Sequence, residues 1–231
     1  AYPRDIERAV ALNLPVAVVK LPKLNVQAMS KWLQRHGVHL DIRDHDNELM
    51  GGVVAHRGCA LLFVCGGDTM EEQRLTVAHE TAHILEHYLC PRAQMIEALG
   101  ESVIEVLDGA RLPTIAERAQ AALCGVRLGA HVHLLPRSGD KRNQTVDRSE
   151  REAEALGMEL VAPNGQIRRI LDSSQVKALD EGRQCAFLAN YFGIPARCFA
   201  DIVEAAAVRR PPSLVSDAVE TLRSRNAAVR V

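Results

Sequence analysis

The stretch that decides the fold is TMEEQRLTVAHETAHILEHYLC, residues 69–90, which contains the pattern H-E-x-x-H. Thr69, or Asp68 before it, is a suitable N-cap, and acidic residues follow in the first turn, where the helix dipole favours them. Apolar residues then recur at helical spacing as far as Pro91, a residue type that ends helices. The pattern therefore predicts one long helix over about residues 70–90.

The H-E-x-x-H pattern places His79 and His83 one helical turn apart on the same face. Two imidazoles in that arrangement converge on one tetrahedral metal ion. Glu80 lies beside the first ligand, where its carboxylate reaches a water on the metal and serves as general base. We therefore expect a metal site on this helix. The alternative is a solvated helical face that carries the same three side chains.

A catalytic zinc needs a third protein ligand. The metzincin continuation of the motif is absent, so a downstream acid is the next candidate, and the helix expected over residues 149–163 offers several. Glu150 shares the face of this helix's apolar stripe, and we expect it to be the third ligand. Glu154 lies one turn further, where its carboxylate supports a ligand histidine. For Glu152 and Glu159 we expect solvated surface positions.

The chain before the long helix predicts a small sheet. The N-terminal segment contains several prolines and is expected to be irregular or broken into short helices. A helical pattern then begins at Asn25 and ends at Gly37. The following alternating and apolar runs predict a three-stranded antiparallel sheet, with strands over residues 38–42, 49–55 and 59–65.

The rest of the chain is predominantly helical, with a polar loop over residues 138–148 and a turn at Asn164-Gly165. Further helices are expected over residues 93–99, 102–107, 114–123, 174–191, 195–208 and about 213–225. The sequence thus predicts an α+β fold that is mostly helical.

The composition argues against several classes of function. Lys and Arg number 28 against 29 Asp and Glu, so we expect no direct nucleic-acid binding and no membrane partner. Aromatic residues make up only 3% of the chain, too few for a platform that stacks single-stranded bases. No apolar run reaches about 18 residues, and we expect no secretion signal because the N-terminus lacks an apolar core region. The six scattered cysteines predict small buried thiols in a reducing, cytoplasmic setting.

Two motifs together resemble a known family. The segment LTVAHETAHILEH (75–87), followed by E-x-x-A-x-x-L-G-x-x-L-V-A-P (150–163), resembles the ImmA/IrrE family of zinc metallopeptidases. The resemblance implies a zincin-like fold of the gluzincin type, with one Zn²⁺ ion. It implies a protein substrate, a helix-turn-helix transcriptional repressor that is cut in a stress response or during mobile-element induction. It also implies a general base and three zinc ligands, which are Glu80 and then His79, His83 and Glu150.

The chain departs from the family pattern in three places. Glu154 stands where Asn or Asp is usual, which predicts a longer contact with a ligand histidine. Leu156-Gly157 stands where Phe-Ala is usual, which predicts looser packing near the site. An apparent insertion over about residues 92–147 is expected to form a lid, a regulatory contact or a substrate-recognition surface. The metallopeptidase domain is therefore expected over residues 1–208, with a helical tail over residues 209–231.

Four further side chains are weaker candidates. His87 lies one turn beyond His83, where it either lines the cleft and donates to an oxyanion or is a helix-end histidine near the C-terminal dipole. Tyr88 is a weaker candidate for the oxyanion. His131 and His133 alternate as on a strand, so they either chelate a metal or are exposed histidines in a loop.

Three functions remain open. The first is a zinc metallo-endopeptidase that hydrolyses a peptide bond in a regulatory protein, with the strand over residues 59–65 holding the substrate as an added strand. The second is a non-cleaving, metal-containing regulatory module that binds a transcriptional repressor. The third, ranked last because the net charge is near zero, is a DNA-binding regulator.

Overall fold

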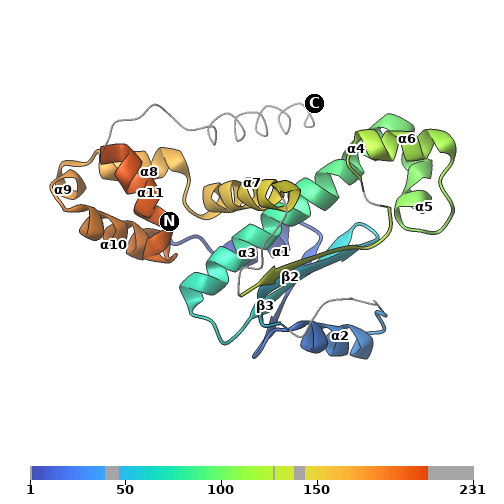
Figure 1. Ribbon diagram of the computed structural model, residues 1–231, viewed down its shortest axis with the longest axis horizontal. Helices are drawn as coiled ribbons and strands as arrows, with labels where there is room; N and C mark the ends of the chain where they lie inside the picture. The colour runs from blue at the N-terminus through green and yellow to red at the C-terminus, as the bar shows by residue number, and fades with distance from the viewer. Residues whose placement is uncertain (1, 40–46, 127, 138–143, 208–231) are drawn as a thin grey trace.

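An open four-stranded sheet lies at the centre of the fold (Figure 1). The computed structural model describes residues 2–39, 47–126, 128–137 and 144–207. The strands follow the order β1-β3-β2-β4 across the sheet. Their bounds are β1 (Val16–Leu21), β2 (Leu49–His56), β3 (Cys59–Cys65) and β4 (His131–Pro136). Helices cover both faces, so the mixed α+β class predicted from the sequence is confirmed.

The sheet is not the three-stranded antiparallel unit that the pattern predicts. β1 pairs parallel with β3, with Val16 opposite Ala60, and β4 pairs antiparallel with β2. The sequence pattern conceals β1 because Pro15 and Pro22 suggest an irregular segment. The two prolines instead flank a six-residue run that is rich in valine, a residue that favours strands.

Two further expectations about the strands are wrong. Val38 and His39 are not in a strand, and residues 40–42 of that predicted strand lie outside the described residues. β3 lies between β1 and β2, so both of its edges are already paired. It therefore cannot receive a substrate as an added strand along residues 59–65.

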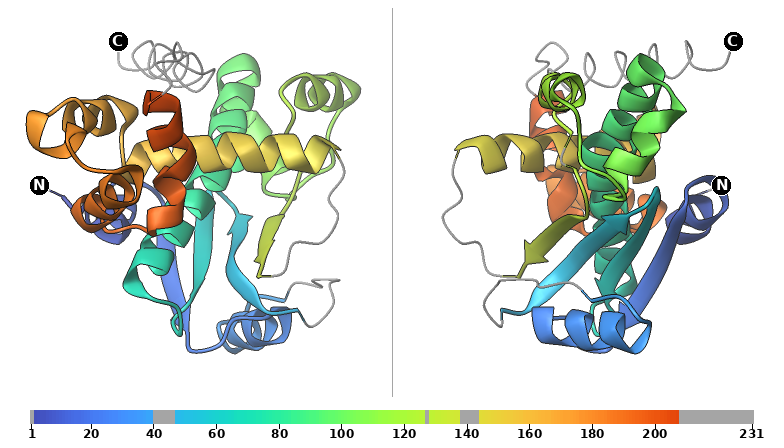
Figure 2. Two further views of the ribbon diagram at one scale, coloured as in Figure 1. Left: turned by 60° about the vertical axis from the view of Figure 1, so that its left-hand side comes forward. Right: turned by 90° about the vertical axis from the view of Figure 1, so that its right-hand side faces the viewer.

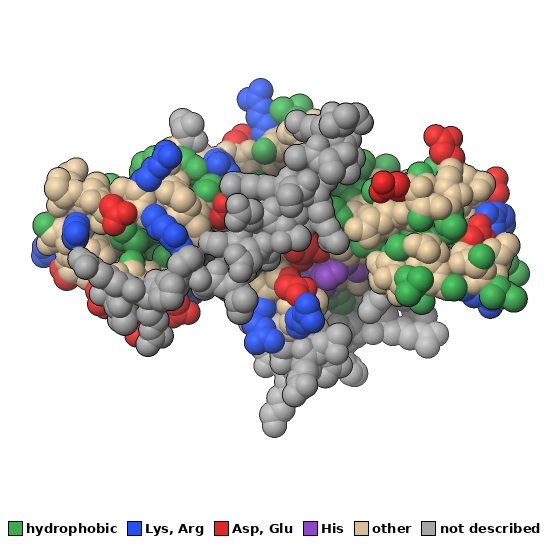
Figure 3. All heavy atoms as spheres, turned by 90° about the horizontal axis from the view of Figure 1, so that it is seen from above, with side chains coloured by type: hydrophobic (Ala, Val, Ile, Leu, Met, Phe, Trp, Pro, Cys, Tyr) green, Lys and Arg blue, Asp and Glu red, His purple; other side chains and the backbone are tan. Residues whose placement is uncertain are grey.

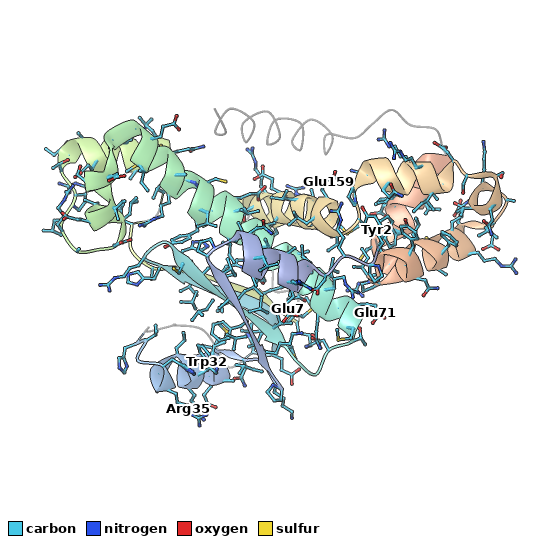
Figure 4. All side chains as sticks on the ribbon, turned by 180° about the vertical axis from the view of Figure 1, so that it is seen from behind. Tyr2, Glu7, Trp32, Arg35, Glu71 and Glu159 are labelled. Carbon is cyan, nitrogen blue, oxygen red and sulfur yellow. The ribbon has the colours of Figure 1, made fainter. Side chains whose placement is uncertain are left out.

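The N-terminal part supplies α1 (Ile6–Asn13) and α2 (Val26–Arg35). Asn25 caps α2 as predicted, because its side chain accepts a hydrogen bond from the amide of Ala28 (2.7 Å). α2 covers one face of the sheet, where the ring of Trp32 meets that of Phe63 on β3 edge to face at 5.5 Å (Figure 4). This contact belongs to a core cluster on the side of the sheet away from the H-E-x-x-H helix.

The opposite face carries α3 (Met70–Ile84), which lies between the sheet and α7 (Gln144–Val161) (Figures 1 and 2). Thr69 is the N-cap, since its hydroxyl accepts a hydrogen bond from the Glu72 amide (3.3 Å). Asp68 instead forms an ion pair with Arg137 (2.7 Å). Because α3 is covered from both sides, the polar H-E-x-x-H residues are brought inside the fold.

Pro91 does not end the long helix as predicted. The chain continues through a π-helical turn, η1 (Leu85–Leu89), into α4 (Cys90–Leu99), and Figure 1 shows one continuous rod. The Cys90 amide donates to the carbonyl of Leu85, five residues back, which is the π pattern. This wider turn directly precedes Pro91, which lies at the start of α4, and a π turn is one of the ways in which a helix passes a proline.

The predicted insertion begins as a small helical unit and ends in the central sheet. The unit contains a 3₁₀ turn, η2 (Glu101–Val103), then α5 (Ile104–Leu107) and α6 (Ile115–Leu123), which confirms the helices expected there. It has its own small apolar cluster around Met95 and Val103. β4 follows and pairs with β2, so the C-terminal part of the insertion belongs to the main fold.

The C-terminal third is helical as expected, with shifted boundaries. α7 begins at Gln144, inside the predicted polar loop, and a helix replaces the turn predicted at Asn164-Gly165. The helices after α7 are α8 (Asn164–Leu171), α9 (Ser174–Lys177), α10 (Glu181–Phe192), the 3₁₀ turn η3 (Ala196–Phe199) and α11 (Ala200–Ala207). The predicted tail over residues 209–231, its helix over 213–225 and loop residues 138–143 lie outside the described residues.

The structure bears on the expectations about membrane-spanning segments and about the cysteines. Among the helices of the described ranges, none combines the length and the apolar content that a bilayer span requires. All six cysteines are free thiols, but only Cys65 is buried and Cys59 is exposed, so the expectation of uniformly buried thiols is wrong.

Candidate metal centre

The three predicted metal ligands meet in space. Nε2 of His79 lies 3.1 Å from Nε2 of His83. In Glu150, which α7 contributes from the other side, Oε2 lies 3.5 Å from Nε2 of His79 and Oε1 lies 3.7 Å from Nε2 of His83. The three donor atoms all lie within 4.8 Å of one another. Two segments that are far apart in the sequence therefore supply one compact donor set.

The spacing of these donors fits a tetrahedral ion. Donors placed at about 2.0–2.1 Å from one ion, at tetrahedral angles, lie about 3.3 Å from one another. The separation of 3.1 Å between the two imidazole nitrogens is close to that value, and each nitrogen has a different oxygen of the Glu150 carboxylate at 3.5 or 3.7 Å. Two imidazole nitrogens and one carboxylate oxygen are also a ligand set of catalytic zinc, which leaves the fourth position for water. The described residues thus form a site that fits a divalent metal ion.

Glu80 is buried directly behind the ligands, with 0% of the residue exposed. Its Oε2 is hydrogen-bonded to Nδ1 of His133 (2.9 Å), whereas its Oε1 has no hydrogen-bond partner among the described residues. Gly51 of β2 makes room for this carboxylate, because a Cβ atom there would lie 2.8 Å from Oε1 and 2.5 Å from Cγ2 of Thr76. One carboxylate oxygen of Glu80 is thus held by His133, and the other is buried beside Gly51 without a hydrogen-bond partner among the described residues.

Gly157 allows α7 to approach α3 closely. A Cβ atom at this position would lie 3.1 Å from both N and Cα of His79, a separation that few real Cβ contacts reach. The prediction of looser packing at Gly157 is therefore wrong, since the glycine brings the two helix backbones together. This close approach carries Glu150, seven residues earlier on α7, to the two histidines.

His133 of β4 is the site residue whose role the sequence did not predict. Its ring stacks on that of His83 at 3.7 Å between centroids, and its Nε2 lies 2.9 Å from Oε1 of Glu150. Its Nδ1 lies 2.9 Å from Glu80, so one imidazole bridges two carboxylates. The interpretation of His133 as an exposed loop histidine is wrong. The alternation at residues 131–133 indicates a strand, but nothing in the sequence gives its register against β2.

At the titratable groups of the site, burial and the neighbouring hydrogen-bond partners shift the pKa in opposite directions. Burial disfavours the charge of Glu150, but hydrogen bonds from His133, His79 and His83 outweigh it and hold the pKa of this carboxyl well below its usual range. Burial lowers the pKa of His133, yet the carboxylates of Glu80 and Glu150 prevail and raise it to about 9. For His83, burial prevails and lowers the pKa, which favours the neutral imidazole that binds metals.

A cavity of about 410 Å³ opens beside the donor set. Its walls include His79 and Glu150 at one end and the apolar side chains of Leu75 and Met158 next to them. From above, histidine and acidic side chains reach the surface together near the middle of the molecule (Figure 3). Glu154 also lines this cavity, but among the described residues it makes no hydrogen bond to either ligand histidine. Its predicted supporting contact is thus not seen.

The remaining candidates lie behind the donor set or away from it. His87 lies inside a continuous helix, so the helix-end interpretation is wrong, and its ring is 5.3 Å from that of His83. The hydroxyl of Tyr88 accepts a hydrogen bond from the amide of Gly58 in the β2–β3 turn (2.7 Å), so it is not directed at the metal ligands. His131 is buried, which contradicts the exposed-loop interpretation for this residue as well.

The two acids expected on the surface have different environments. Glu152 is exposed, as predicted, and pairs with Arg148 on the preceding turn of α7 (2.8 Å). Glu159 is half-buried and accepts a hydrogen bond from the amide of Asn164 (2.9 Å) at the start of α8, where Figure 4 labels it. Glu159 therefore has a structural role that its position in the sequence did not reveal.

Comparison of the chain with protein-family models, with curated proteins and with solved structures gives no match. The likeness to the ImmA/IrrE family therefore stays a resemblance of motifs. The geometry of the donor set is the observation from which function is argued.

Proposed function

We propose that this chain is a zinc-dependent endopeptidase with a zincin-like fold. The observation that carries the proposal is the donor set of His79, His83 and Glu150, whose spacing matches that of a tetrahedral ion. The buried carboxylate of Glu80 beside this set is the second element that hydrolysis requires. A metal held only for structure would have no use for a carboxylate with one oxygen left available.

When bound, a zinc ion supplies a Lewis acid that polarises a carbonyl and lowers the pKa of water towards about 7. Glu80 Oε1 then accepts a proton from the attacking water and delivers it to the leaving amine. The complete burial of Glu80 strengthens this proton transfer, because few other solvent molecules compete for the carboxylate. His79, His83 and the ionised Glu150 would hold the ion, and the lowered pKa of His83 favours its neutral, metal-binding form.

The features around the site suit an extended polypeptide. β4 pairs with β2 and, among the described strands, has no neighbour on its other side. An edge strand of this kind binds a peptide by main-chain hydrogen bonds. The cavity beside His79 offers apolar walls, including Leu135 of β4, to a neighbouring substrate side chain. The resemblance to the ImmA/IrrE family extends the proposal to a helix-turn-helix repressor as the substrate.

The test is a Glu80→Gln variant, with Glu152→Gln as a matched control on the exposed face of α7. Each protein is loaded with zinc and incubated with candidate repressors, and the products are measured by mass spectrometry with and without a chelator. We expect Glu80→Gln to bind zinc like the wild type and to lose about 10²–10⁴-fold in kcat, the usual contribution of a general base. The control keeps full activity.

Two outcomes contradict the proposal. Full activity in Glu80→Gln removes the general base from the mechanism. Stable, intact complexes between the zinc-loaded wild type and a repressor, without fragments, favour the non-cleaving regulatory module instead.

A further inference from the structure

The histidine of β4 that bridges two carboxylates has no counterpart in the motifs that define the site. His133 reaches Oε2 of Glu80 through Nδ1 and Oε1 of Glu150 through Nε2, both at 2.9 Å. The general base and a metal ligand are therefore tied to opposite ends of one ring. Any displacement of that ring affects both groups at once.

His133 is placed as a donor rather than as a metal ligand. A carboxylate oxygen only accepts hydrogen bonds, so a ring nitrogen that bonds to it must carry a proton. Both nitrogens of His133 face such oxygens, and no lone pair is left for a metal ion. The group of donor atoms that lies within 4.8 Å accordingly consists of His79, His83 and Glu150.

The ring is also held rigidly. Its face stacks on the imidazole of His83 with 26° between the planes. Its backbone is fixed within the sheet, where His133 pairs with Val53 of β2. Only 16% of its side chain is exposed, so few other orientations are open to it. A ring fixed by stacking and by strand pairing fixes in turn the carboxylates that it bonds.

We propose that His133 is a positioning residue of the metal centre, which orients Glu150 towards the metal through Nε2 and Glu80 towards the reacting water through Nδ1. This inference rests on the proposed peptidase function only for the part that concerns Glu80. By engaging Oε2, His133 leaves Oε1 of Glu80 as the atom that exchanges a proton. By engaging Oε1 of Glu150, it orients the carboxylate plane at the two ligand histidines.

Two conservative variants separate the two contacts. The amide of Asn lies close to the position of Nδ1 in a histidine, and the amide of the longer Gln close to that of Nε2. His133→Asn therefore keeps a donor for Glu80 and loses the one for Glu150, whereas His133→Gln does the reverse. The affinity for Zn²⁺ alone is measured by chelator competition, and kcat and KM are measured on whichever repressor the wild type cleaves.

We expect His133→Asn to bind Zn²⁺ about 10–100-fold more weakly, the usual cost of losing a partner behind a metal ligand. His133→Gln is expected to bind Zn²⁺ within about threefold of the wild type and to lose about 10–100-fold in kcat, with KM unchanged because His133 does not touch the substrate. In Co²⁺-loaded His133→Asn, the visible absorption bands keep their positions, since the ligand set is the same.

The matched controls are His131→Asn and His131→Gln, two residues away on the same strand. They are expected to keep the Zn²⁺ affinity, even if they lower the unfolding free energy, which circular dichroism follows. A shift of the Co²⁺ bands in His133→Asn identifies His133 as a ligand and overturns the proposal. Equal metal affinity and equal kcat in both His133 variants also overturn it. A wild type that cleaves nothing refutes the peptidase, while the affinity difference between Asn and Gln still supports the contact with Glu150.

Discussion

Two neighbouring clusters of histidine and glutamate residues differ in the charge of their carboxyl groups. The front cluster surrounds the donor set, and the rear cluster lies behind it, 5.3 Å from ring to ring at His83 and His87. The front cluster consists of His79, Glu80, His83, His133 and Glu150. The rear cluster consists of three consecutive residues of η1, which are Glu86, His87 and Tyr88, and of His131, whose ring lies 6.5 Å from that of His87 and 6.3 Å from that of Tyr88.

Both clusters are built on the same helix rod and on β4, and the front cluster adds Glu150 from α7. Their carboxylates differ in charge. In the front cluster, burial disfavours the charge of Glu150, but the imidazoles around it prevail and keep it ionised. In the rear cluster, burial raises the pKa of Glu86 to about 7, and its Oε2 has no hydrogen-bond partner among the described residues. A metal centre is thus defined by the pairing of imidazoles with ionised carboxylates, and the number of histidines alone does not identify it.

The largest expected effect compares His83→Ala with His87→Ala. Loss of His83 removes one of three ligands, so the Zn²⁺ affinity falls by more than about 100-fold, beyond the range for a partner behind a ligand. His87→Ala keeps the affinity within about threefold. Chelator competition measures both values, and a comparable loss in His87→Ala would place the rear cluster in the metal site.

A smaller effect concerns the room that Gly51 gives to the front cluster. In Gly51→Ala the new Cβ would lie 2.5 Å from Cγ2 of Thr76 and 2.8 Å from Oε1 of Glu80. We therefore expect the unfolding free energy to fall by about 1–3 kcal/mol, and kcat to fall because Glu80 is displaced. Gly165→Ala is the control, because a Cβ there meets nothing within 4 Å. Since Gly165 lies in α8, alanine is expected to raise stability by up to about 1 kcal/mol. Urea denaturation measures the unfolding free energy of both variants. Equal unfolding free energies for Gly51→Ala and the wild type would show that the front cluster has room for a methyl group.

The smallest effect is the pH dependence that Glu86 adds. Its pKa is raised from an ordinary 4.5 to about 7 in the folded chain, so between these values the folded state binds more protons than the unfolded state. Stability from this group is therefore present below about pH 4.5 and is lost as the pH rises to about 7. Discounted for partial exposure, the loss is about 1–2 kcal/mol.

Glu86→Gln tests this dependence because glutamine does not titrate. Relative to the wild type, the variant gains about 1–2 kcal/mol between pH 5 and pH 8, measured by urea denaturation in the presence of a chelator. Glu97→Gln, on the exposed face of α4, serves as the control. A constant difference between variant and wild type across this range would mean that Glu86 titrates normally.

Local patterns predicted the part of the site that lies on helices. The spacing of His79 and His83, the cap at Thr69 and the stripe that Glu150 follows all depend on residues within a few turns. Helical geometry converts such spacings directly into faces. The three donors therefore met as expected, although α7 begins before the predicted helix.

The parts of the fold and of the site that the sequence did not predict depend on contacts between distant segments of the chain. β1 and β4 join the sheet next to strands that lie far from them in the chain, and no local pattern states which strand pairs with which. The contact of His133 with Glu80 spans 53 positions and follows from the register of Val53 with His133. The path through Pro91 depends on a single π turn, a rare feature that no pattern in the sequence predicted.

The π turn before α4 has a consequence for the helical unit that follows it. Each residue of an α-helix advances the chain by about 100° around the axis and by about 1.5 Å along it. A π turn advances by a smaller angle per residue, so it takes up one extra residue while the helix on either side keeps nearly the same direction. Deleting one residue within Leu85–Leu89 is therefore expected to restore ordinary winding and to leave α4 to α6 close to their present orientation, while His79 and His83 upstream stay where they are. The rod can therefore gain or lose one amino acid at this turn while the helical unit keeps its direction relative to the two histidines.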